Sequence, residues 1–276
     1  MQISFVVPTF NSRQDLRLFL DSFIRFNSAK DVSVFIVEAS DDKGMSSLVE
    51  EYRQKVNIEL HYVANHGYAS ACNYGHRHSA EADIYVFCNP DIIFVSDVVT
   101  RIRSELDVES YGSVIQKDVR GRVRTFDVYP QYKSLGTELL RIHRFVNRLR
   151  LYHPAVVFPV GAFMMFGRNV LIRTGPFDER FFMYYEETDY FFRLRRNNRA
   201  KILRDVHVIH KVSSSVKSDP RLDAFALHDR SLYLYCEKYG DFSYFDSLVR
   251  FYRLRSMFDG RYKKRYETLL VLRGDK

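Results

Sequence analysis

Along the first 95 residues, short continuous apolar runs alternate with stretches whose apolar positions recur at helical spacing. The apolar runs have the length of buried strands, and they cover residues 3–7, 32–37, 58–63 and 84–88. The stretches between them predict helices at 46–54, at 69–80 and after a cap at Asn11 or Ser12. Strands separated by helices indicate βαβ units, and therefore an α/β fold with a mainly parallel, Rossmann-like central sheet and helices on both faces.

Polar or turn-forming residues stand at the carboxyl ends of the predicted strands. They are Pro8 and Thr9, Glu38, Asn65, and the tripeptide Asn89-Pro90-Asp91. In open parallel α/β sheets, ligands bind in the crevice at the carboxyl ends of the strands. We therefore expect the binding site at this edge of the sheet.

The strand–helix alternation is lost over residues 118–158, where "DVRGRVRTFDVYP" predicts strand and loop, and "GAFMMF" after this region predicts a buried strand. An amphipathic helix is expected at 137–151, with an apolar stripe formed by Leu139, Ile142, Val146 and Leu149. Its second stripe contains Arg141, Arg144 and Arg148, and the simplest interpretation of these arginines is a solvated face. Another helix is expected at 222–240, closed by Gly240.

The composition fits a large globular domain, because 46% of the 276 residues are hydrophobic. Three cysteines stand far apart without a Cys-x-x-Cys pair, so we expect reduced core thiols rather than disulfides or a zinc site. The N-terminus has no basic region typical of a signal peptide, and no stretch approaches the roughly 18 apolar residues that span a bilayer. We therefore expect a cytoplasmic protein, either soluble or peripheral on the inner face of the plasma membrane.

The formal net charge of +8 favours anionic partners in general, and basic residues are concentrated between positions 250 and 265. Two interpretations of this C-terminal segment stay open: a packed helix pair with a solvated basic face, or an interfacial helix attracted to anionic lipid. Nucleic acid is not an expected partner, since no recognised nucleic-acid-binding module accompanies the basic residues. The sequence leaves open whether the chain forms a homodimer.

Seven motifs occur in an order that resembles family 2 glycosyltransferases, in particular bacterial rhamnosyltransferase-like enzymes of surface-polysaccharide synthesis. The motifs are "FVVPTFN", "VEASDD", "NHGYASACNYG", "NPD", "GAFMMF", "FDERFFMYYEETDYFFRLRR" and "HVIHKVSSS". The resemblance covers roughly residues 1–240 and implies a GT-A fold, a nucleotide-sugar donor, a divalent metal and inversion at the anomeric carbon. It implies a GT-A domain at 1–221, with a donor-binding half at 1–117 and an acceptor-binding and catalytic half at 118–221. A helical basic arm at 222–276 would follow.

A metal site is expected because the leaving nucleoside diphosphate gains negative charge, which Mg²⁺ or Mn²⁺ can neutralise. By resemblance, Asp91 is the direct ligand and His210 is a second ligand, with His207 as the lesser alternative. Asn89 stands where the family usually has an aspartate, and it is expected to reach the ribose or a metal-bound water. Alone, Asn-Pro-Asp would be only a turn that caps the helix expected near Ser96.

A general base is expected in "YYEETD", because the acceptor hydroxyl must lose its proton as it attacks the anomeric carbon. The resemblance favours Glu187, where the family usually has aspartate. Glu186 is the second candidate and Asp189 the third, although Asp189 is better suited to orienting its helix. The simpler interpretation is that acids in a first helical turn favour the helix dipole.

The donor is expected to lie against residues from several motifs. By resemblance they are Pro8, Thr9, Glu38, Asn65, Gly67, Asn73, Asn89, Gly161 and Ala162. Asp41 is an alternative to Glu38, since the motif after the second strand is one residue short, but Asp41 also fits a solvated turn. Gly67 lets the chain turn into the helix at 69–80.

These expectations combine into a metal-dependent inverting glycosyltransferase. It would move a sugar from dTDP-rhamnose or a UDP-hexose to a glycan or lipid-linked acceptor in bacterial polysaccharide synthesis. An oxidoreductase is disfavoured, because "NHGYASACNYG" lacks the Gly-x-Gly-x-x-Gly pattern, and a nucleotidyltransferase is disfavoured, because "PTFNSRQDL" lacks a glycine- and lysine-rich phosphate loop. The substitutions at Asn89, Glu38 and Glu187 keep one alternative open, a catalytically silent protein that binds sugar nucleotide or glycan within an assembly complex.

Overall fold

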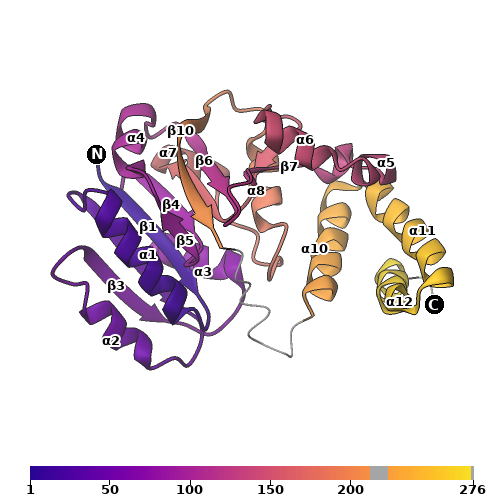
Figure 1. Ribbon diagram of the computed structural model, residues 1–276, viewed down its shortest axis with the longest axis horizontal. Coiled ribbons are helices and arrows are strands. Elements are labelled where there is room, and N and C mark those ends of the chain that lie inside the picture. Colours follow the sequence, from indigo (N-terminus) through magenta and orange to yellow (C-terminus); the bar gives the residue numbers. More distant parts are fainter. Residues whose placement is uncertain (212–222, 275–276) are drawn as a thin grey trace.

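The computed structural model describes residues 1–211 and 223–274, and an eight-stranded sheet lies at the centre of its larger half (Figure 1). The strand order is β3-β2-β1-β4-β9-β6-β10-β5. The strands are β1 (Ile3–Thr9), β2 (Val32–Glu38), β3 (Asn57–Tyr62), β4 (Ile84–Cys88), β5 (Ile92–Phe94), β6 (Tyr111–Lys117), β9 (Phe163–Gly167) and β10 (Ala200–His210). The four predicted N-terminal strands are present.

The sheet is mixed but mostly parallel. Strands β1 to β4 pair in parallel, as do β6 and β10, whereas β9 is antiparallel to both of its neighbours. The edge strand β5 is antiparallel to β10. The carboxyl ends of β1, β2, β3 and β4 therefore meet at one edge, as the sequence predicts.

Helices cover both faces of the sheet, and each face has its own apolar core. One face is covered by α1 (Arg13–Phe26), α2 (Gly44–Glu50) and α4 (Val98–Glu105), and the other by α3 (Tyr68–His78), α7 (Arg168–Thr174) and α8 (Glu186–Leu194). The alternation of side chains along β1 divides its residues between the cores, with Phe5 and Val7 facing the first and Val6 the second. This arrangement explains why β1 is a continuous apolar run.

The prediction of a single helix at 137–151 is wrong, because the chain forms two shorter helices there. They are α5 (Leu135–Leu139) and α6 (Ile142–Leu149), and between them Arg141 has a left-handed backbone with φ 53°. The predicted apolar stripe is also only partly buried. Val146 packs inward, whereas Leu139 and Leu149 are mostly exposed.

The carboxamide of Asn147 fixes the orientation of α6. It accepts a hydrogen bond from the Phe126 backbone nitrogen at 2.9 Å and donates one to the Phe126 carbonyl at 2.7 Å. Phe126 begins β7 (Phe126–Val128), which pairs with β8 (Val157–Pro159) and is followed by the short 3₁₀ helix η1 (Pro130–Tyr132). The buried side of α6 is thus set by a polar contact as well as by Val146.

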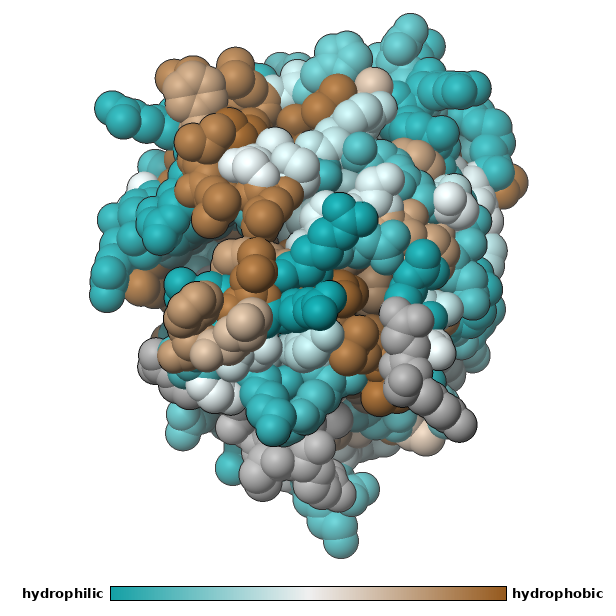
Figure 2. All heavy atoms as spheres, turned by 90° about the vertical axis from the view of Figure 1, so that its right-hand side faces the viewer, coloured by the Kyte–Doolittle hydropathy of each residue, from teal (hydrophilic) through white to brown (hydrophobic). Residues whose placement is uncertain are grey.

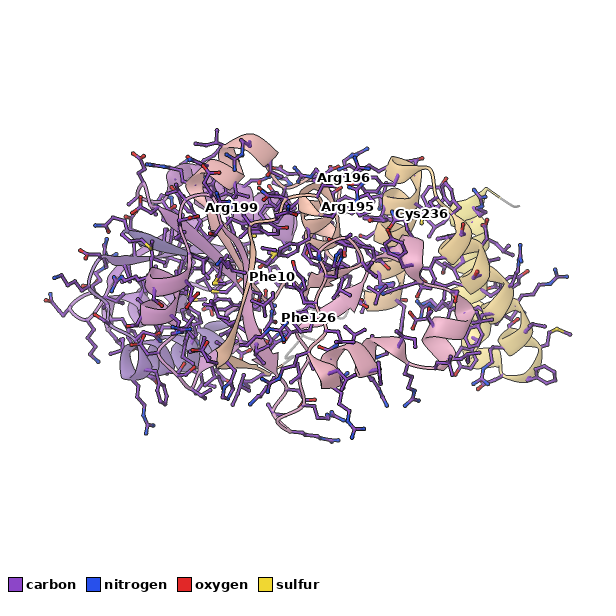
Figure 3. The ribbon with its side chains drawn as sticks, turned by 90° about the horizontal axis from the view of Figure 1, so that it is seen from above. Phe10, Phe126, Arg195, Arg196, Arg199 and Cys236 are labelled. Carbon is purple, nitrogen blue, oxygen red and sulfur yellow. The ribbon has the colours of Figure 1, made fainter. Side chains whose placement is uncertain are left out.

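The C-terminal part consists of α10 (Ala224–Tyr239), α11 (Ser243–Phe258), the 3₁₀ helix η2 (Gly260–Tyr262) and α12 (Lys263–Arg273). Gly240 closes α10 in a left-handed conformation, as predicted. Seen from above, α10 stands between the region of Arg195 and Arg196 and the pair α11–α12 (Figure 3). Leu232 and Tyr235 of α10 belong to the same apolar core as α3 and α8.

The domain boundary predicted between 221 and 222 lies outside the described residues, as does the end of the "HVIHKVSSS" motif from residue 212. Within the described ranges, no helix has both the length and the apolar character needed to cross a bilayer.

Candidate active site

A pocket lies at the carboxyl edge of the sheet, and it contains four of the residues predicted to bind the donor: Pro8, Thr9, Asn65 and Gly67. The rest of its lining is mainly apolar: Phe10, Ala39, Tyr68, Ala71, Phe182 and Met183. Phe10 follows β1 near the middle of the molecule (Figure 3). Sequence reasoning did not place Phe182 and Met183 here, since they come from a segment more than a hundred residues away from the others.

Gly67 joins this pocket to the segment before α8. Its φ is +94°, and a Cβ there would lie 2.2 Å from the Phe182 carbonyl oxygen. The backbone nitrogen of Tyr68 donates to the same oxygen at 2.9 Å. Only glycine allows the two backbones to approach so closely, so the start of α3 is docked against Phe182 and Met183.

Glu38 is fully buried at the end of β2. Its Oε1 accepts a hydrogen bond from the Ser40 backbone nitrogen at 2.7 Å, whereas Oε2 has no hydrogen-bond partner among the described residues. Asp41, the alternative, is exposed, and Asp42 accepts from the Gly44 backbone nitrogen at the start of α2. Glu38 is therefore the buried carboxylate at this strand end.

Asp91 and His210 come together where β5 pairs with β10. His210 lies opposite Ile92, and its Nε2 is 3.3 Å from Asp91 Oδ1. Both side chains are largely buried. The cap of the next helix is Asp97, which accepts from the Thr100 backbone nitrogen at 3.0 Å, so Asp91 does not serve as that cap.

A carboxylate and an imidazole are suitable ligands for Mn²⁺, and the carboxylate alone suits Mg²⁺. In residues 1–211 and 223–274, no group of three or more His, Cys, Asp or Glu side chains has the geometry of a metal site. Two protein ligands fit an ion whose other positions are filled by diphosphate and water. The alternative ligand, His207, has its pKa lowered by burial and by the nearby charges of Lys117 and Arg150, and it lies in a positive environment.

Glu186 and Glu187 begin α8 directly after two residues with unusual backbones. Tyr184 and Tyr185 have φ values of 68° and 70°, which cost about 1 to 2 kcal/mol each for residues with a side chain. Burial, and then the charge of Glu187, raise the pKa of Glu186 well above its ordinary value, and burial also raises the pKa of Glu187. Each has a buried Oε2 without a hydrogen-bond partner in the described part of the chain.

Residues 161 and 162 connect the glutamates with the end of β4. A Cβ on Gly161 would lie 3.1 Å from Glu187 Cβ, so the absence of a side chain at position 161 leaves room for the Glu187 side chain. The Asn89 backbone nitrogen donates to the Ala162 carbonyl at 3.0 Å, and the Tyr68 hydroxyl donates to the Gly161 carbonyl at 3.3 Å. The structure thus brings together residues from the donor and base predictions.

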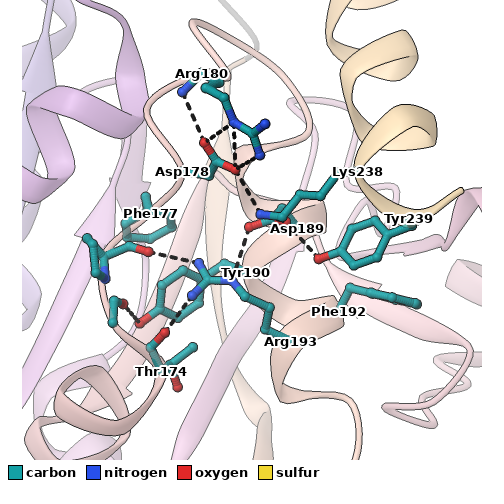
Figure 4. Close-up of polar contacts among 12 residues, drawn as sticks. Thr174, Phe177, Asp178, Arg180, Asp189, Tyr190, Phe192, Arg193, Lys238 and Tyr239 are labelled. Atoms are coloured by element: carbon teal, nitrogen blue, oxygen red, sulfur yellow. Dashed lines mark hydrogen bonds and ion pairs between the residues drawn. The ribbon is translucent and has the colours of Figure 1, made fainter.

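Two predicted site residues are engaged elsewhere. The Asn73 carboxamide exchanges hydrogen bonds with the backbone of Phe177 and donates to Glu179, which holds the 177–179 segment against α3. Asp189 is fully buried and accepts hydrogen bonds from the Tyr239 hydroxyl at 2.7 Å and Arg193 Nε at 3.1 Å, with Lys238 Nζ 2.5 Å away (Figure 4). Asp189 therefore anchors α8 to α10.

A second, larger cavity lies between β7, α5 and α6 and the C-terminal helices. Its lining includes Val160, next to Gly161, and the ion pair of Asp127 and Lys133, whose charges act on the Glu187 carboxyl group. From the C-terminal helices, His228, Tyr252 and Arg265 face the same cavity. No local sequence pattern predicts this cavity, because its residues come from six separate elements.

Comparison with known proteins decides the family. Residues 4–175 match the family described as glycosyl transferase family 2, which is more than half of the chain. The chain belongs to this family. The matched range ends before α8, so Glu186 and Glu187 lie beyond it.

Among curated proteins, this family 2 chain is 22% identical over 207 residues to the low-salt glycan biosynthesis hexosyltransferase Agl10 of Haloferax volcanii. The match covers 71% of this chain and 62% of the relative, so the chain spans less than two thirds of that protein.

Two solved glycosyltransferases have a similar fold. S. aureus TarS 1–349 in complex with UDP-GlcNAc has a TM-score of 0.63 at 15% identity, covering 98% of this chain and 80% of TarS. The mannosyltransferase PcManGT of Pyrobaculum calidifontis, in complex with GDP-Man and Mn²⁺, has a TM-score of 0.57 at 17% identity, covering 90% and 64%. The fold is GT-A, as predicted.

Proposed function

We propose that this family 2 glycosyltransferase is a metal-dependent, inverting enzyme that transfers a hexosyl or rhamnosyl group from a UDP or dTDP donor. The acceptor would be a glycan or a lipid-linked oligosaccharide in bacterial polysaccharide synthesis. The observation that carries the proposal is the convergence of Glu38, the Asp91–His210 pair and Glu187 on the carboxyl edge of one sheet. The solved structures of similar fold contain UDP-GlcNAc or GDP-Man with Mn²⁺, which supports a nucleotide-sugar donor.

In this proposal the donor lies in the pocket formed by Pro8, Thr9, Asn65 and Gly67. The unpartnered Oε2 of Glu38 accepts a hydrogen bond from the nucleoside. Asp91 and His210 hold Mn²⁺ or Mg²⁺, and the ion, when bound, neutralises the charge of the diphosphate leaving group. Asn89, Gly161 and Ala162 border the sugar at the end of β4 and the start of β9.

Glu187 acts as the general base. Its Oε2 takes the proton of the acceptor hydroxyl, the acceptor oxygen bonds to the anomeric carbon, and the bond from that carbon to the diphosphate oxygen breaks. A raised pKa suits this task, because the carboxylate then binds a proton more strongly than an exposed glutamate does. Glu186 is buried beside Glu187, and burial together with the charge of Glu187 raises the pKa of Glu186 still further.

The acceptor would enter through the larger cavity that contains Val160, Asp127 and Lys133. Its lining combines aromatic rings, such as Tyr244 and Tyr252, with charged and polar groups, which is suitable for sugars. A cytoplasmic location belongs to the same proposal, and it is supported by three cysteines that are free and buried.

Calorimetric titration with UDP, dTDP and GDP, each with Mn²⁺, Mg²⁺ or EDTA, tests the site. We expect one nucleotide to bind only with metal, and Asp91→Ala to weaken this binding by at least about tenfold, since one direct charged ligand is lost. His210→Ala should weaken binding with Mn²⁺ more than with Mg²⁺.

The matched control is Asp205→Ala, which removes an exposed carboxylate of β10 that pairs with Arg101 and leaves the strand end unchanged. Equal binding by wild type and Asp91→Ala would contradict the metal assignment. Nucleotide binding without turnover over a panel of donor sugars would instead favour the catalytically silent alternative.

A further inference from the structure

The surface beside the acceptor cavity combines exposed arginines with exposed large apolar side chains. On α6, Val146 and Asn147 face the protein, whereas Arg144, Phe145, Arg148 and Leu149 face solvent, as does Arg141 just before the helix. Leu140, at the end of α5, is 76% exposed and Phe145 is 56% exposed. Figure 2 shows apolar side chains gathered at this end of the molecule, bordered by hydrophilic ones.

A turn from another part of the chain adds positive charge to the same place. Arg122 and Arg124 line a surface hollow together with Arg144 and Arg148. Asp118 contacts Arg122 and Arg124, but no ion pair joins Arg141, Arg144 or Arg148 to any residue that the structure describes. The pKa of Arg144 is lowered, chiefly by the positive charge of Arg141. Desolvation and the charges of Arg124 and Arg122 lower it further. The arginines therefore repel one another, and an anionic partner would relieve this repulsion.

We propose that α5, α6 and the 118–124 turn form a docking face for an anionic lipid bilayer. The face consists of Arg122, Arg124, Arg141, Arg144 and Arg148 with Leu139, Leu140, Phe145 and Leu149. A bilayer fits because arginines pair with lipid phosphates while leucine and phenylalanine side chains enter the interfacial region. A soluble anion would leave the apolar side chains exposed to water.

This docking face adjoins the cavity proposed for the acceptor. Arg124 and Leu139 line both the docking face and the acceptor cavity, so a docked bilayer would lie at the mouth of that cavity. An acceptor anchored in the bilayer could then reach Glu187 without leaving the membrane surface. The docking itself does not depend on the proposed sugar transfer.

The C-terminal arm, which the sequence suggested as an interfacial element, is the weaker candidate. Several of its basic side chains are occupied by acids within the arm: Arg265 with Asp229, Arg273 with Asp246, and Lys264 with Asp223. These pairs lower the positive charge that the arm offers to lipid.

Co-sedimentation of the full chain with vesicles tests the docking face. We expect binding to mixed phosphatidylglycerol–phosphatidylcholine vesicles at low salt, and not to phosphatidylcholine alone. Combining Arg141→Gln, Arg144→Gln and Arg148→Gln should weaken partition about a hundredfold, since each basic residue contributes about fivefold near an anionic surface. The control with the same charge change is Arg250→Gln, Arg253→Gln and Lys263→Gln, all exposed in the arm, and it should keep most of the binding.

A fluorescence measurement gives an independent result, because the chain contains no tryptophan. In Phe145→Trp, emission should shift to the blue on adding the anionic vesicles, whereas in Phe258→Trp, at an 87% exposed position of α11, it should not. Equal loss of partition in the two triple variants, or a shift only in Phe258→Trp, would overturn the proposal.

Discussion

The candidate site is defined by carboxylate oxygens that the protein buries without giving them partners. Three such atoms are the Oε2 atoms of Glu38, Glu186 and Glu187. None of the three has a hydrogen-bond partner in the described ranges, although each is shielded from water. A buried polar group that lacks a hydrogen bond costs about 1 to 3 kcal/mol, so three at one edge lower stability. Such a cost is typical of sites where a substrate supplies the missing partner.

At the same scale, the two glutamates should differ in their kinetic roles. We expect Glu187→Gln to lower kcat by about a thousandfold, because an amide cannot accept the proton of the acceptor, with KM for the donor little changed. Glu186→Gln should lower kcat much less and leave the acidic limb of the pH–rate profile nearly unchanged, since Glu186 has the more strongly raised pKa and is still protonated and neutral where Glu187 ionises. A larger kcat loss in Glu186→Gln would exchange the two assignments.

The raised pKa of Glu186 also predicts a dependence of stability on pH. Between its ordinary value of 4.5 and the raised pKa, the folded state binds more protons than the unfolded state, so the Glu186 contribution to stability falls as pH rises. Glu186→Gln removes this contribution. Urea unfolding at about pH 5 and about pH 8 should show that the variant gains stability relative to wild type at the higher pH. An unchanged difference between the two would contradict the pKa shift.

At the scale of elements, α10 holds the strained start of α8 in place. The Ser231 hydroxyl donates to the Met183 carbonyl at 2.8 Å, just before the two left-handed tyrosines. Lys238 and Tyr239 contact Asp189 one turn into α8 (Figure 4). The first C-terminal helix is therefore part of the scaffold that positions Glu187.

The contact between the start of α3 and the segment before α8 predicts an unequal response to two glycine substitutions. Gly67→Ala places a Cβ against the Phe182 backbone, whereas Gly121→Ala, with φ +76°, meets no atom within 4 Å. Gly121→Ala should cost about 1 kcal/mol of stability from backbone strain alone, and Gly67→Ala at least about twice as much. Nucleotide affinity should fall only in Gly67→Ala, as calorimetry and urea unfolding can measure. Similar losses of affinity in both would place the nucleotide elsewhere.

At the scale of the whole molecule, both halves and the C-terminal helices contribute to one site. The pocket proposed for the donor contains Phe182 and Met183 from the segment before α8, and the cavity proposed for the acceptor contains His228 and Arg265 from the C-terminal helices. Binding at such a site links these parts of the chain, so the complex should unfold as a more stable unit.

The corresponding prediction concerns thermal unfolding. The matching nucleotide with Mn²⁺, at about a hundred times its dissociation constant, should add about 2.7 kcal/mol to the free energy of unfolding and raise Tm. The nucleotide with EDTA should add much less, and Asp91→Ala should abolish the difference. A Tm increase of the same size without metal would separate nucleotide binding from the Asp91–His210 pair.

Much of the fold followed from the sequence alone. Apolar runs of strand length, helical spacing between them and Gly240 after α10 are local patterns, and local backbone preferences act on them directly. The strand-end rule also located Pro8, Thr9, Glu38 and Asp91 at one edge, because parallel strands bring their carboxyl ends together.

Only the tertiary structure decided how the remaining side chains are used. Asp189 and Glu187 lie two residues apart, yet Asp189 is engaged by Tyr239, fifty positions later, and Glu187 lies against Gly161. Asn73 is likewise engaged by Phe177, and α6, which follows the break at Arg141, is held to β7 by the hydrogen bonds between Asn147 and Phe126. These outcomes depend on contacts between residues far apart in the chain, which no local pattern of hydrophobic and polar positions encodes.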